Sequence, residues 1–426
     1  MDTFFHSVHL ESDLCKGCIN CIKRCPTEAI RVRNGKAHII KEFCIDCGEC
    51  IRICPHHAKK ATYDGFDILD KYKHTVALPA PSLYGQFNNL EDINIILKGL
   101  IDIGFDDVYE VSAAAEMISE LTRDYIKNHE HKLPVINSAC PSVVRLIRVR
   151  FPNLIDLLLP LKTPMDLAAS LARKRAIENT GLSSDEIGII FISPCPAKVT
   201  SVYSPLGSEK SEVDAVIGMN EVYPKLVQVM KHTDENANNE EDNYVMSGKI
   251  GITWGESGGE AAGVLSDSYL AADGIENVIR VLEDIEDQKL PNLEFIELNA
   301  CSGGCVGGVL AVENPYIAKA KIHKLRRYLP VSLNRLDGKI PDKAYWDTDV
   351  EYQPVYRLSQ DLDESINLMA KVEELLSRLP GLDCGSCGAP SCKALAEDVA
   401  RGIAKEKDCI YILRDYIHKL SDEISN

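Results

Sequence analysis

The sequence predicts a multidomain α/β protein, in which a layered central region lies between two short cysteine-rich segments. Three observations support this prediction. The chain has 426 residues, which is enough for two or three domains. Its 16 cysteines fall into three groups, at residues 15–54, 140–305 and 384–409. Between the outer groups, short apolar runs alternate with segments of helical periodicity, as is typical of α/β layers.

The composition limits the possible classes of function. The net charge of −17 argues against a nucleic-acid-binding protein, because phosphate contact requires clustered Lys and Arg. No apolar run approaches the roughly 20 residues that cross a bilayer. The first residues show neither the basic nor the apolar part of a secretory signal. We therefore expect a cytoplasmic protein, in which many cysteines indicate metal or redox chemistry rather than disulfides.

The first cysteine group, within residues 1–71, is the most specific pattern in the chain. "CKGCINCIKRCP" and "CIDCGECIRICP" share the spacing C-x2-C-x2-C-x3-C-P of bacterial two-cluster ferredoxins. In such runs the fourth cysteine binds the other cluster, so we predict a ferredoxin-like domain with two [4Fe–4S] clusters. Zinc binding is the weaker alternative. The predicted ligands are Cys15, Cys18, Cys21 and Cys54 for cluster one, and Cys44, Cys47, Cys50 and Cys25 for cluster two.

The central region, residues 72–357, alternates strand-like and helical segments. The strand-like runs are "HTVALPA", "EIGIIFIS", "VDAVIGM" and "NLEFIELNA", and the helical ones include "LEDINIILKGLIDIG" and "PMDLAASLARKRAIENTG". The acidic run at residues 232–243 is expected to be a solvated loop. The glycine-rich run "WGESGGEAAG", residues 254–263, is expected at a strand end. It lacks the Lys-Ser/Thr pair of a phosphate loop, so nucleotide binding is not expected.

Three of the strand-like runs end in cysteine motifs, "VINSACPSV", "IIFISPCPAKVTS" and "FIELNACSGGCVGG". Because α/β proteins place their sites at the carboxyl ends of strands, the loops could converge on one cluster. The glycines of the third motif would let the backbone approach a metal closely. The alternative is a set of unrelated buried cysteines, which are common in protein cores. The cysteines concerned are Cys140, Cys195, Cys301 and Cys305.

The last cysteine group lies in residues 358–426. A predicted helix, "DESINLMAKVEELLSRLPG", ends at a Pro-Gly pair, and a glycine-rich loop with three cysteines follows it. The fourth cysteine comes after a second predicted helix, "CKALAEDVARGIA". This segment resembles the small α-helical domain that holds one [4Fe–4S] cluster in several anaerobic redox proteins, with zinc as the alternative. The predicted ligands are Cys384, Cys387, Cys392 and Cys409.

The three central motifs, "NSACP", "SPCPAK" and "ELNACSGGCVGG", resemble the cluster-binding motifs of [FeFe]-hydrogenases, T-S-C-C-P, M-P-C-x-x-K and E-x-M-x-C-x-x-G-C-x-x-G-G. The resemblance implies a hydrogenase H-domain with its active site between two sheet lobes. It implies an H-cluster, a [4Fe–4S] cluster joined to a two-iron unit with CO, CN⁻ and an azadithiolate bridge, beside three accessory [4Fe–4S] clusters. Cys140, Cys195, Cys301 and Cys305 would hold the H-cluster. Lys198, and Ser82 in "PAPS", would contact its cyanides.

In its departures from the family pattern, the chain resembles the sensory branch of the family. Ala139 occupies the position of the cysteine that relays protons in the fast enzymes, and a methyl group cannot exchange a proton. Ser193 and Asn299 replace methionines around the two-iron unit. The glutamates of the usual proton path are not placed by the sequence, although Glu116 and Glu120 lie upstream.

The resemblance therefore implies reversible H₂ oxidation with low turnover, in a protein that senses H₂ or redox state. It implies a ferredoxin-type electron partner, dedicated maturation proteins for the two-iron unit and a separate signalling protein. Two alternatives stay open. One is a metabolic hydrogenase linked to ferredoxin, and the other is a hydrogenase-like iron–sulfur assembly protein without the two-iron unit.

Overall fold

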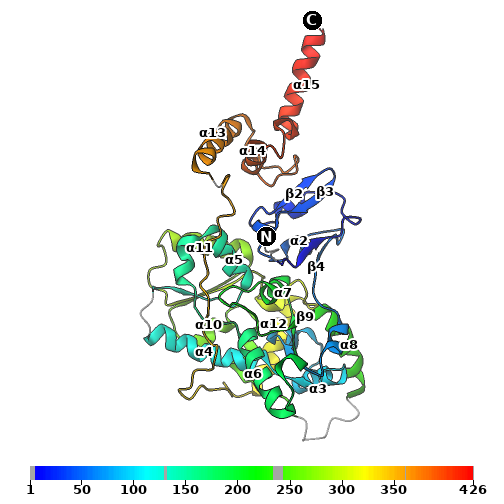
Figure 1. Ribbon diagram of the computed structural model, residues 1–426, viewed down its shortest axis with the longest axis vertical. Coiled ribbons are helices and arrows are strands. Elements are labelled where there is room, and N and C mark those ends of the chain that lie inside the picture. The colour runs from blue at the N-terminus through cyan, green and yellow to red at the C-terminus, as the bar shows by residue number, and fades with distance from the viewer. Residues whose placement is uncertain (1–4, 129–131, 234–242, 360, 426) are drawn as a thin grey trace. The chain divides into compact units, whose positions relative to one another are not determined.

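The computed structural model describes residues 5–128, 132–233, 243–359 and 361–425. The chain forms two compact units (Figure 1). The larger unit comprises Met1–Ser7, Ile45–Gly48 and Thr62–Tyr352, and the smaller comprises Val8–Cys44, Glu49–Ala61 and Gln353–Asn426. The first and the last cysteine groups thus fall largely within one unit, whereas the division into three domains stays a prediction.

The larger unit contains a four-stranded, fully parallel sheet. Every residue of its strand β8 is buried, as expected for a parallel strand covered on both faces. Helices α3 (Asn94–Asp102), α6 (Pro164–Thr180) and α8 (Met219–Thr233) pack on this sheet. In spatial order the strands are β6 (Asp107–Val108), β5 (His74–Pro79), β8 (Ile187–Ser193) and β9 (Ala215–Gly218).

A second parallel sheet, of three strands, forms the other lobe of the larger unit. Helices α4 (Val111–Asn128), α10 (Gly259–Val264) and α11 (Ile275–Glu286) belong to this lobe. Because each sheet is parallel, the carboxyl ends of its strands meet at one edge, where the loops that carry the cysteine motifs begin. In spatial order the strands are β10 (Tyr269–Asp273), β11 (Phe295–Asn299) and β7 (Val135–Ile136).

The predicted strands in the central region are confirmed as β5, β8, β9 and β11, and the predicted helices as α3 and α6. Helix α6 ends as its sequence indicates, at Gly181 in the left-handed conformation (φ 69°). The expectation that residues 254–263 follow a strand is wrong, because they follow helix α9 (Lys249–Thr253). Gly251 lies in this helix, and its close packing against Ser112 O leaves no room for a Cβ atom. Most of the acidic run lies outside the described residues.

The smaller unit combines two β-ribbons with short and long helices. Strand β1 (Val8–Leu10) pairs with β4 (Lys59–Ala61), and β2 (Ile30–Arg33) pairs with β3 (Lys36–Ile39), both antiparallel. Asn34 and Gly35 join β2 to β3 with positive φ at both residues, the conformation of a type I′ hairpin. The helices are α1 (Asn20–Lys23), α2 (Glu49–Arg52), α13 (Leu362–Arg378), α14 (Cys392–Ala400) and α15 (Ile410–Ser425).

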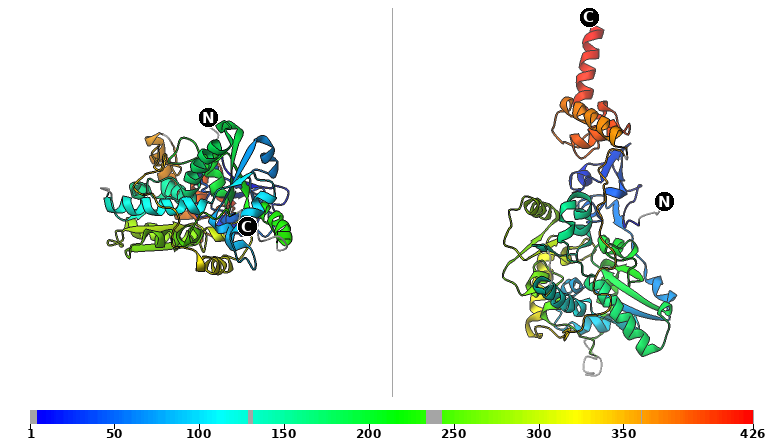
Figure 2. Two further views of the ribbon diagram at one scale, coloured as in Figure 1. Left: turned by 90° about the horizontal axis from the view of Figure 1, so that it is seen from below. Right: turned by 60° about the vertical axis from the view of Figure 1, so that its left-hand side comes forward.

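Helices α13 and α14 pack on each other and bury a small apolar core, while α15 extends beyond them as a single helix (Figure 2). The side chains of Cys387, Cys392 and Cys409 contact or belong to this core. Among the described residues, no helix has the length and apolar character needed to cross a membrane.

Candidate active site

One buried cavity of the larger unit collects loops from both sheets. Residues that follow β5, β7 and β8 meet residues of β11 and of the glycine-rich segment 254–263 around it. The lining residues used below are Ser82, Ala139, Lys198, Glu260, Glu297, Asn299 and Cys305.

Three of the four central cysteines interact electrostatically across this site. Cys140 and Cys195 each occupy the residue before a helix, α5 (Pro141–Arg150) and α7 (Pro196–Tyr203). The position favours a thiolate, because the helix N-terminus carries partial positive charge. Cys305 lies close enough to both for their charges to interact, and Cys301 precedes it on the same loop.

Burial raises the pKa of Cys195 to about 11 and that of Cys305 to about 12. Ionising such thiols together is unfavourable unless a positive charge lies beside them. A bound metal cluster supplies that charge and removes the thiol protons. The chemistry of these cysteines therefore fits a metal cluster.

Glycines in the third motif bring its loop against other backbone segments. A Cβ atom at Gly304 would lie 2.4 Å from Ser257 N, and one at Gly308 would lie 2.2 Å from Pro194 O. Pro194 precedes the ligand candidate Cys195, so Gly308 brings two cysteine loops to close range, whereas Gly304 packs against the glycine-rich segment 254–263. The structure shows a close approach of these glycines to neighbouring backbone, and their close approach to a metal stays a prediction.

Lys198 and Ser82 present a cation and a hydroxyl group to the cavity. The Lys198 side chain is largely buried, and its Nζ donates to Ala139 O at 3.2 Å. Among the described residues, no ion pair joins Lys198 to a carboxylate. The buried Ser82 Oγ has no hydrogen-bond partner within the described part of the chain. Both groups fit a ligand with anionic acceptors, such as cyanide.

The three positions that depart from the family pattern have different environments. The Ala139 methyl group and the Asn299 amide line the cavity, and Asn299 Nδ2 donates to Glu297 Oε1 at 2.6 Å. Ser193 is turned toward the Cys195 loop instead: its Oγ donates to Cys195 O at 2.8 Å and accepts from Cys195 N at 3.3 Å. Ser193 therefore shapes the cysteine loop.

The sequence analysis missed a pair of buried glutamates in the cavity wall. Glu260, in α10, accepts a hydrogen bond from Asn137 Nδ2 at 2.7 Å. Glu297, in β11, accepts from the backbone N–H groups of Gly258 and Ala261 at 2.9 and 2.8 Å. Burial raises the pKa of Glu260 well above its usual range, and the adjacent Glu297 raises it further. Burial also raises the pKa of Glu297, but hydrogen bonds from the backbone of Ala261 and Gly258 oppose this rise. Glu260 is therefore the member of the pair that keeps its proton near neutral pH.

The sequence carries a signal for only one member of this pair. Glu297 is the glutamate of "ELNACSGGCVGG", whereas Glu260 lies in the glycine-rich run 254–263, where no motif marks it. The upstream candidates have structural roles: Glu116 accepts from Gly248 N and Leu333 N, and Glu120 accepts from Leu336 N.

In the smaller unit the structure brings together the four cysteines predicted for cluster one. Cys21 is close enough to Cys15, Cys18 and Cys54 for their charges to interact. Cys25, Cys44 and Cys50 belong to the same unit, whereas Cys47 lies in the segment Ile45–Gly48 of the larger unit.

The C-terminal cysteines also lie near one another. Cys387 interacts electrostatically with Cys384 and Cys409. Cys392 is the first residue of helix α14 rather than part of the preceding loop.

Comparison with known families first defines the chain as an iron–sulfur protein. Residues 7–55 match the family "4Fe-4S dicluster domain", and residues 379–411 match "Putative Fe-S cluster". Residues 73–271 and 260–309 match "Iron only hydrogenase large subunit, C-terminal domain". The last match spans more than half of the chain, which therefore belongs to the [FeFe]-hydrogenase family.

Curated relatives are identical to this chain at about a quarter of the aligned residues. The chain is 25% identical to "Iron hydrogenase 1" of Clostridium pasteurianum over 60% of this chain and 53% of that protein. It is 23% identical to "NADP-reducing hydrogenase subunit HndD" of Solidesulfovibrio fructosivorans over 48% of this chain and 43% of that protein. It thus spans about half the length of these two. It is 24% identical to "Periplasmic [Fe] hydrogenase large subunit" of Nitratidesulfovibrio vulgaris, over 71% of this chain and 86% of that protein.

Solved structures with a related chain path include an apo [FeFe]-hydrogenase HydA1 variant from Chlamydomonas reinhardtii. It has a TM-score of 0.49 and 15% identity, over 66% of this chain and 95% of that chain. A structure described in connection with oxygen inactivation of [FeFe]-hydrogenase has a TM-score of 0.48 and 16% identity, over 67% and 98% of the respective chains.

Proposed function

We propose that this chain interconverts H₂ with protons and electrons at an H-cluster, that it does so slowly, and that it senses H₂ or redox state. Family membership supports the class of reaction. The observation that carries the low turnover is the Ala139 methyl group in the cavity wall, where the fast enzymes have a proton-relaying thiol.

The proposed H-cluster ligands come from the three strand-end loops. They are Cys140, Cys195, Cys301 and Cys305. When bound, the two-iron part of the cofactor would supply the metal site at which H₂ is formed or split. The buried thiols of Cys195 and Cys305 support a metal at this position, because burial alone makes their ionisation unfavourable.

Lys198 and Ser82 would orient the cofactor by hydrogen bonds to its anionic ligands. The unpartnered Ser82 Oγ and the Lys198 ammonium group are both available from the cavity wall. Charge-assisted hydrogen bonds of this kind are roughly twice as strong as neutral ones. They would favour a ligand with cyanide groups over an ordinary iron–sulfur cluster, which supports a hydrogenase over an assembly protein.

Protons would be handled by Glu260 in place of the missing thiol. Its carboxyl group lines the same cavity as Ala139 and holds a proton near neutral pH because it is buried. Glu297, hydrogen-bonded to backbone N–H groups and to Asn299, is the stronger acid of the pair and would return a proton to Glu260 after Glu260 has donated its own. A carboxyl donor with a raised pKa suits general acid catalysis at neutral pH.

Electrons would leave through the accessory clusters to a ferredoxin-type partner, and a separate protein would receive the sensory signal. The family matches at residues 7–55 and 379–411 support iron–sulfur clusters in both segments. Dedicated maturation proteins would install the two-iron unit.

Infrared spectroscopy of the purified, fully matured protein tests this proposal. We expect CO and CN⁻ stretching bands from the two-iron unit, and we expect the CN⁻ bands to shift in Lys198→Met. A matured sample without such bands would contradict both the sensory and the metabolic hydrogenase, and would favour the assembly protein. H₂ evolution as fast as that of a metabolic hydrogenase in the same assay would contradict the low-turnover part alone.

A further inference from the structure

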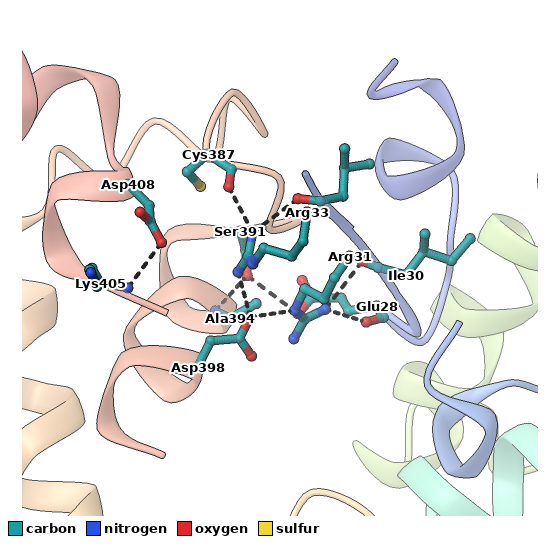
Figure 3. Close-up of polar contacts among 11 residues, drawn as sticks. Glu28, Ile30, Arg31, Arg33, Cys387, Ser391, Ala394, Asp398, Lys405 and Asp408 are labelled. Atoms are coloured by element: carbon teal, nitrogen blue, oxygen red, sulfur yellow. Dashed lines mark hydrogen bonds and ion pairs between the residues drawn. The ribbon is translucent and has the colours of Figure 1, made fainter. Parts of the chain in front are cut away.

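The C-terminal cysteine loop makes backbone contact with the β2–β3 hairpin of the ferredoxin-like segment, within the smaller unit. Val32 N donates to Gly388 O at 2.7 Å, as in an added strand pairing. Beside it, Arg33 Nη1 donates to the carbonyl oxygen of Cys387 at 2.7 Å (Figure 3). One hairpin strand thus holds the loop at a cysteine predicted to bind the C-terminal cluster.

Glycine is required at this contact. Gly388 has a φ of +81°, a conformation that other residues rarely adopt. A Cβ atom at this position would lie 1.9 Å from Val32 O, which is far inside van der Waals contact. Any side chain at residue 388 would therefore separate the loop from the hairpin.

A buried ion-pair cluster fixes the same two segments. Arg31 Nε and Arg33 Nη2 both donate to Asp398 Oδ2 at 2.8 Å, and Asp398 lies on helix α14 (Figure 3). Asp398 is 3% exposed. Arg31 also interacts with the charge of Glu397, whereas Arg33 places its guanidinium group next to Cys387.

A second contact joins the neighbours of two predicted ligand sets. Lys23, which lies between Cys21 and Cys25 in the sequence, donates through Nζ to Asp383 O. A Cβ atom at Gly385 would lie 3.3 Å from Ile22 Cδ1. Ile22 directly follows Cys21, and Gly385 directly follows Cys384.

We propose that the C-terminal cluster exchanges electrons with the ferredoxin-like clusters across this contact. In this proposal Arg33 is a positioning residue that raises the reduction potential of the C-terminal cluster. In each transfer, one electron leaves a ferredoxin-like cluster, which is oxidised, and reduces the C-terminal cluster; no bond forms or breaks. The proposal rests on the cluster content given under Proposed function. It makes the C-terminal cluster an extension of the electron chain rather than an isolated site.

The physical basis is the charge of the reduced cluster. Reduction adds a negative charge, and a guanidinium group held beside a ligand stabilises that charge. Net charge and hydrogen bonding are main determinants of iron–sulfur potentials. The Arg33 bond to Cys387 O fixes the cation at the ligand, and Asp398 keeps its side chain in place.

The test is a redox titration of the full chain, loaded anaerobically with iron and sulfide and followed by electron paramagnetic resonance. The C-terminal signal is identified as the one lost in Cys409→Ser. At the potential that half-reduces this cluster in the natural protein, we expect a several-fold lower ratio of reduced to oxidised cluster in Arg33→Gln. We expect Arg33→Lys, which keeps the charge, to stay near the natural ratio. Lys371→Gln on α13, which removes an exposed charge of the same unit, is the matched control.

Gly388→Ala tests the electron contact separately. We expect weaker magnetic interaction between the reduced C-terminal and ferredoxin-like clusters, and slower reduction of the C-terminal cluster after mixing with a reductant. Equal ratios of reduced to oxidised C-terminal cluster in Arg33→Gln and Lys371→Gln, with unchanged magnetic interaction in Gly388→Ala, would overturn only the proposed electron exchange across this contact. If the iron-loaded natural protein shows no C-terminal signal, as would happen with zinc at these cysteines, both the electron exchange across this contact and the proposed cluster content are overturned.

Discussion

Each unit of the molecule buries a carboxyl group, and the two groups have opposite surroundings. In the smaller unit, Asp398 accepts hydrogen bonds from two guanidinium groups, those of Arg31 and Arg33. In the larger unit, Glu260 accepts one from the neutral amide of Asn137 and faces a second carboxyl group, Glu297. The first environment favours the charged carboxylate, whereas the second favours the protonated carboxyl group. The buried environment, rather than the residue type, decides what each carboxyl group can do.

The largest effect is expected where the fixed charge is removed. Asp398→Asn removes the carboxylate to which both guanidinium groups donate, and breaking a buried ion pair costs about 3–5 kcal/mol. We expect the free energy of unfolding of the smaller unit to fall by about this amount. Denaturation followed by the visible iron–sulfur absorbance measures it.

Asp415→Asn is the matched control for this comparison. Asp415 forms an exposed pair with Arg414 at 3.7 Å, and exposed pairs contribute about 0–1 kcal/mol. Similar losses of stability in both variants would show that burial does not distinguish the two ion pairs.

At Glu260, the expected effect is a lower rate of H₂ evolution. Glu260→Gln keeps the hydrogen-bonding shape but carries no exchangeable acid proton, and we expect H₂ evolution to fall about 100-fold, as for the loss of a general acid. Because burial raises the pKa of Glu260, its acid form persists to higher pH than that of an exposed glutamate. Evolution by the natural protein should therefore fall as the pH rises through the raised pKa, and the variant should lack this decline.

Glu256→Gln is the control for the Glu260 prediction. Glu256 is also buried, but its carboxylate pairs with His323 at 3.0 Å. We expect its rate and pH profile to stay close to those of the natural protein. Unchanged activity of Glu260→Gln, with CO and CN⁻ bands of normal intensity, would rule out the relay role of Glu260.

The difference between the units also explains what the sequence could predict. In the smaller unit, the spacing of Cys15, Cys18 and Cys21 places three predicted ligands in one short segment, so this part of the predicted set follows from the local sequence. In the larger unit, Cys140, Cys195 and Cys305 meet because parallel strands end at common sheet edges. That convergence could be predicted because strand-like runs precede each motif.

Residues that act through packing could not be predicted in the same way. Glu260 lies on a short helix in a glycine-rich run, and nothing in its local sequence indicates that it faces Glu297 in another segment. Likewise, Ser193 aligns with a residue expected near the two-iron unit, but its hydroxyl group bonds the Cys195 backbone. The contact between Gly388 and Val32 joins segments from opposite ends of the chain. Each depends on side-chain direction or on chain-distant packing, which spacing does not encode.

A smaller change, an increase in the rate of H₂ evolution, is expected when a thiol is introduced in the same cavity wall as Glu260. Ala139→Cys adds a group that can exchange a proton at the cavity wall, and we expect H₂ evolution to rise by at least about tenfold. Ala139→Ser is the control, because a hydroxyl group of similar size is a much weaker acid. An unchanged or lower rate in fully matured Ala139→Cys would contradict the idea that the alanine limits turnover.

The smallest effect concerns the one hydroxyl group in the cavity wall that lacks a partner among the described residues. Ser82→Ala should leave the stability of the cofactor-free protein nearly unchanged, since Ser82 Oγ makes no hydrogen bond to be lost there. In the matured protein it should remove one hydrogen bond of about 0.5–1.5 kcal/mol to a cyanide, weakening retention of the two-iron unit several-fold. The measurement is the CN⁻ stretching frequency, which should shift in Ser82→Ala and stay unchanged in Ser193→Ala, whose hydroxyl group bonds the Cys195 backbone instead. A shift in Ser193→Ala alone would reverse the assignment of these two serines.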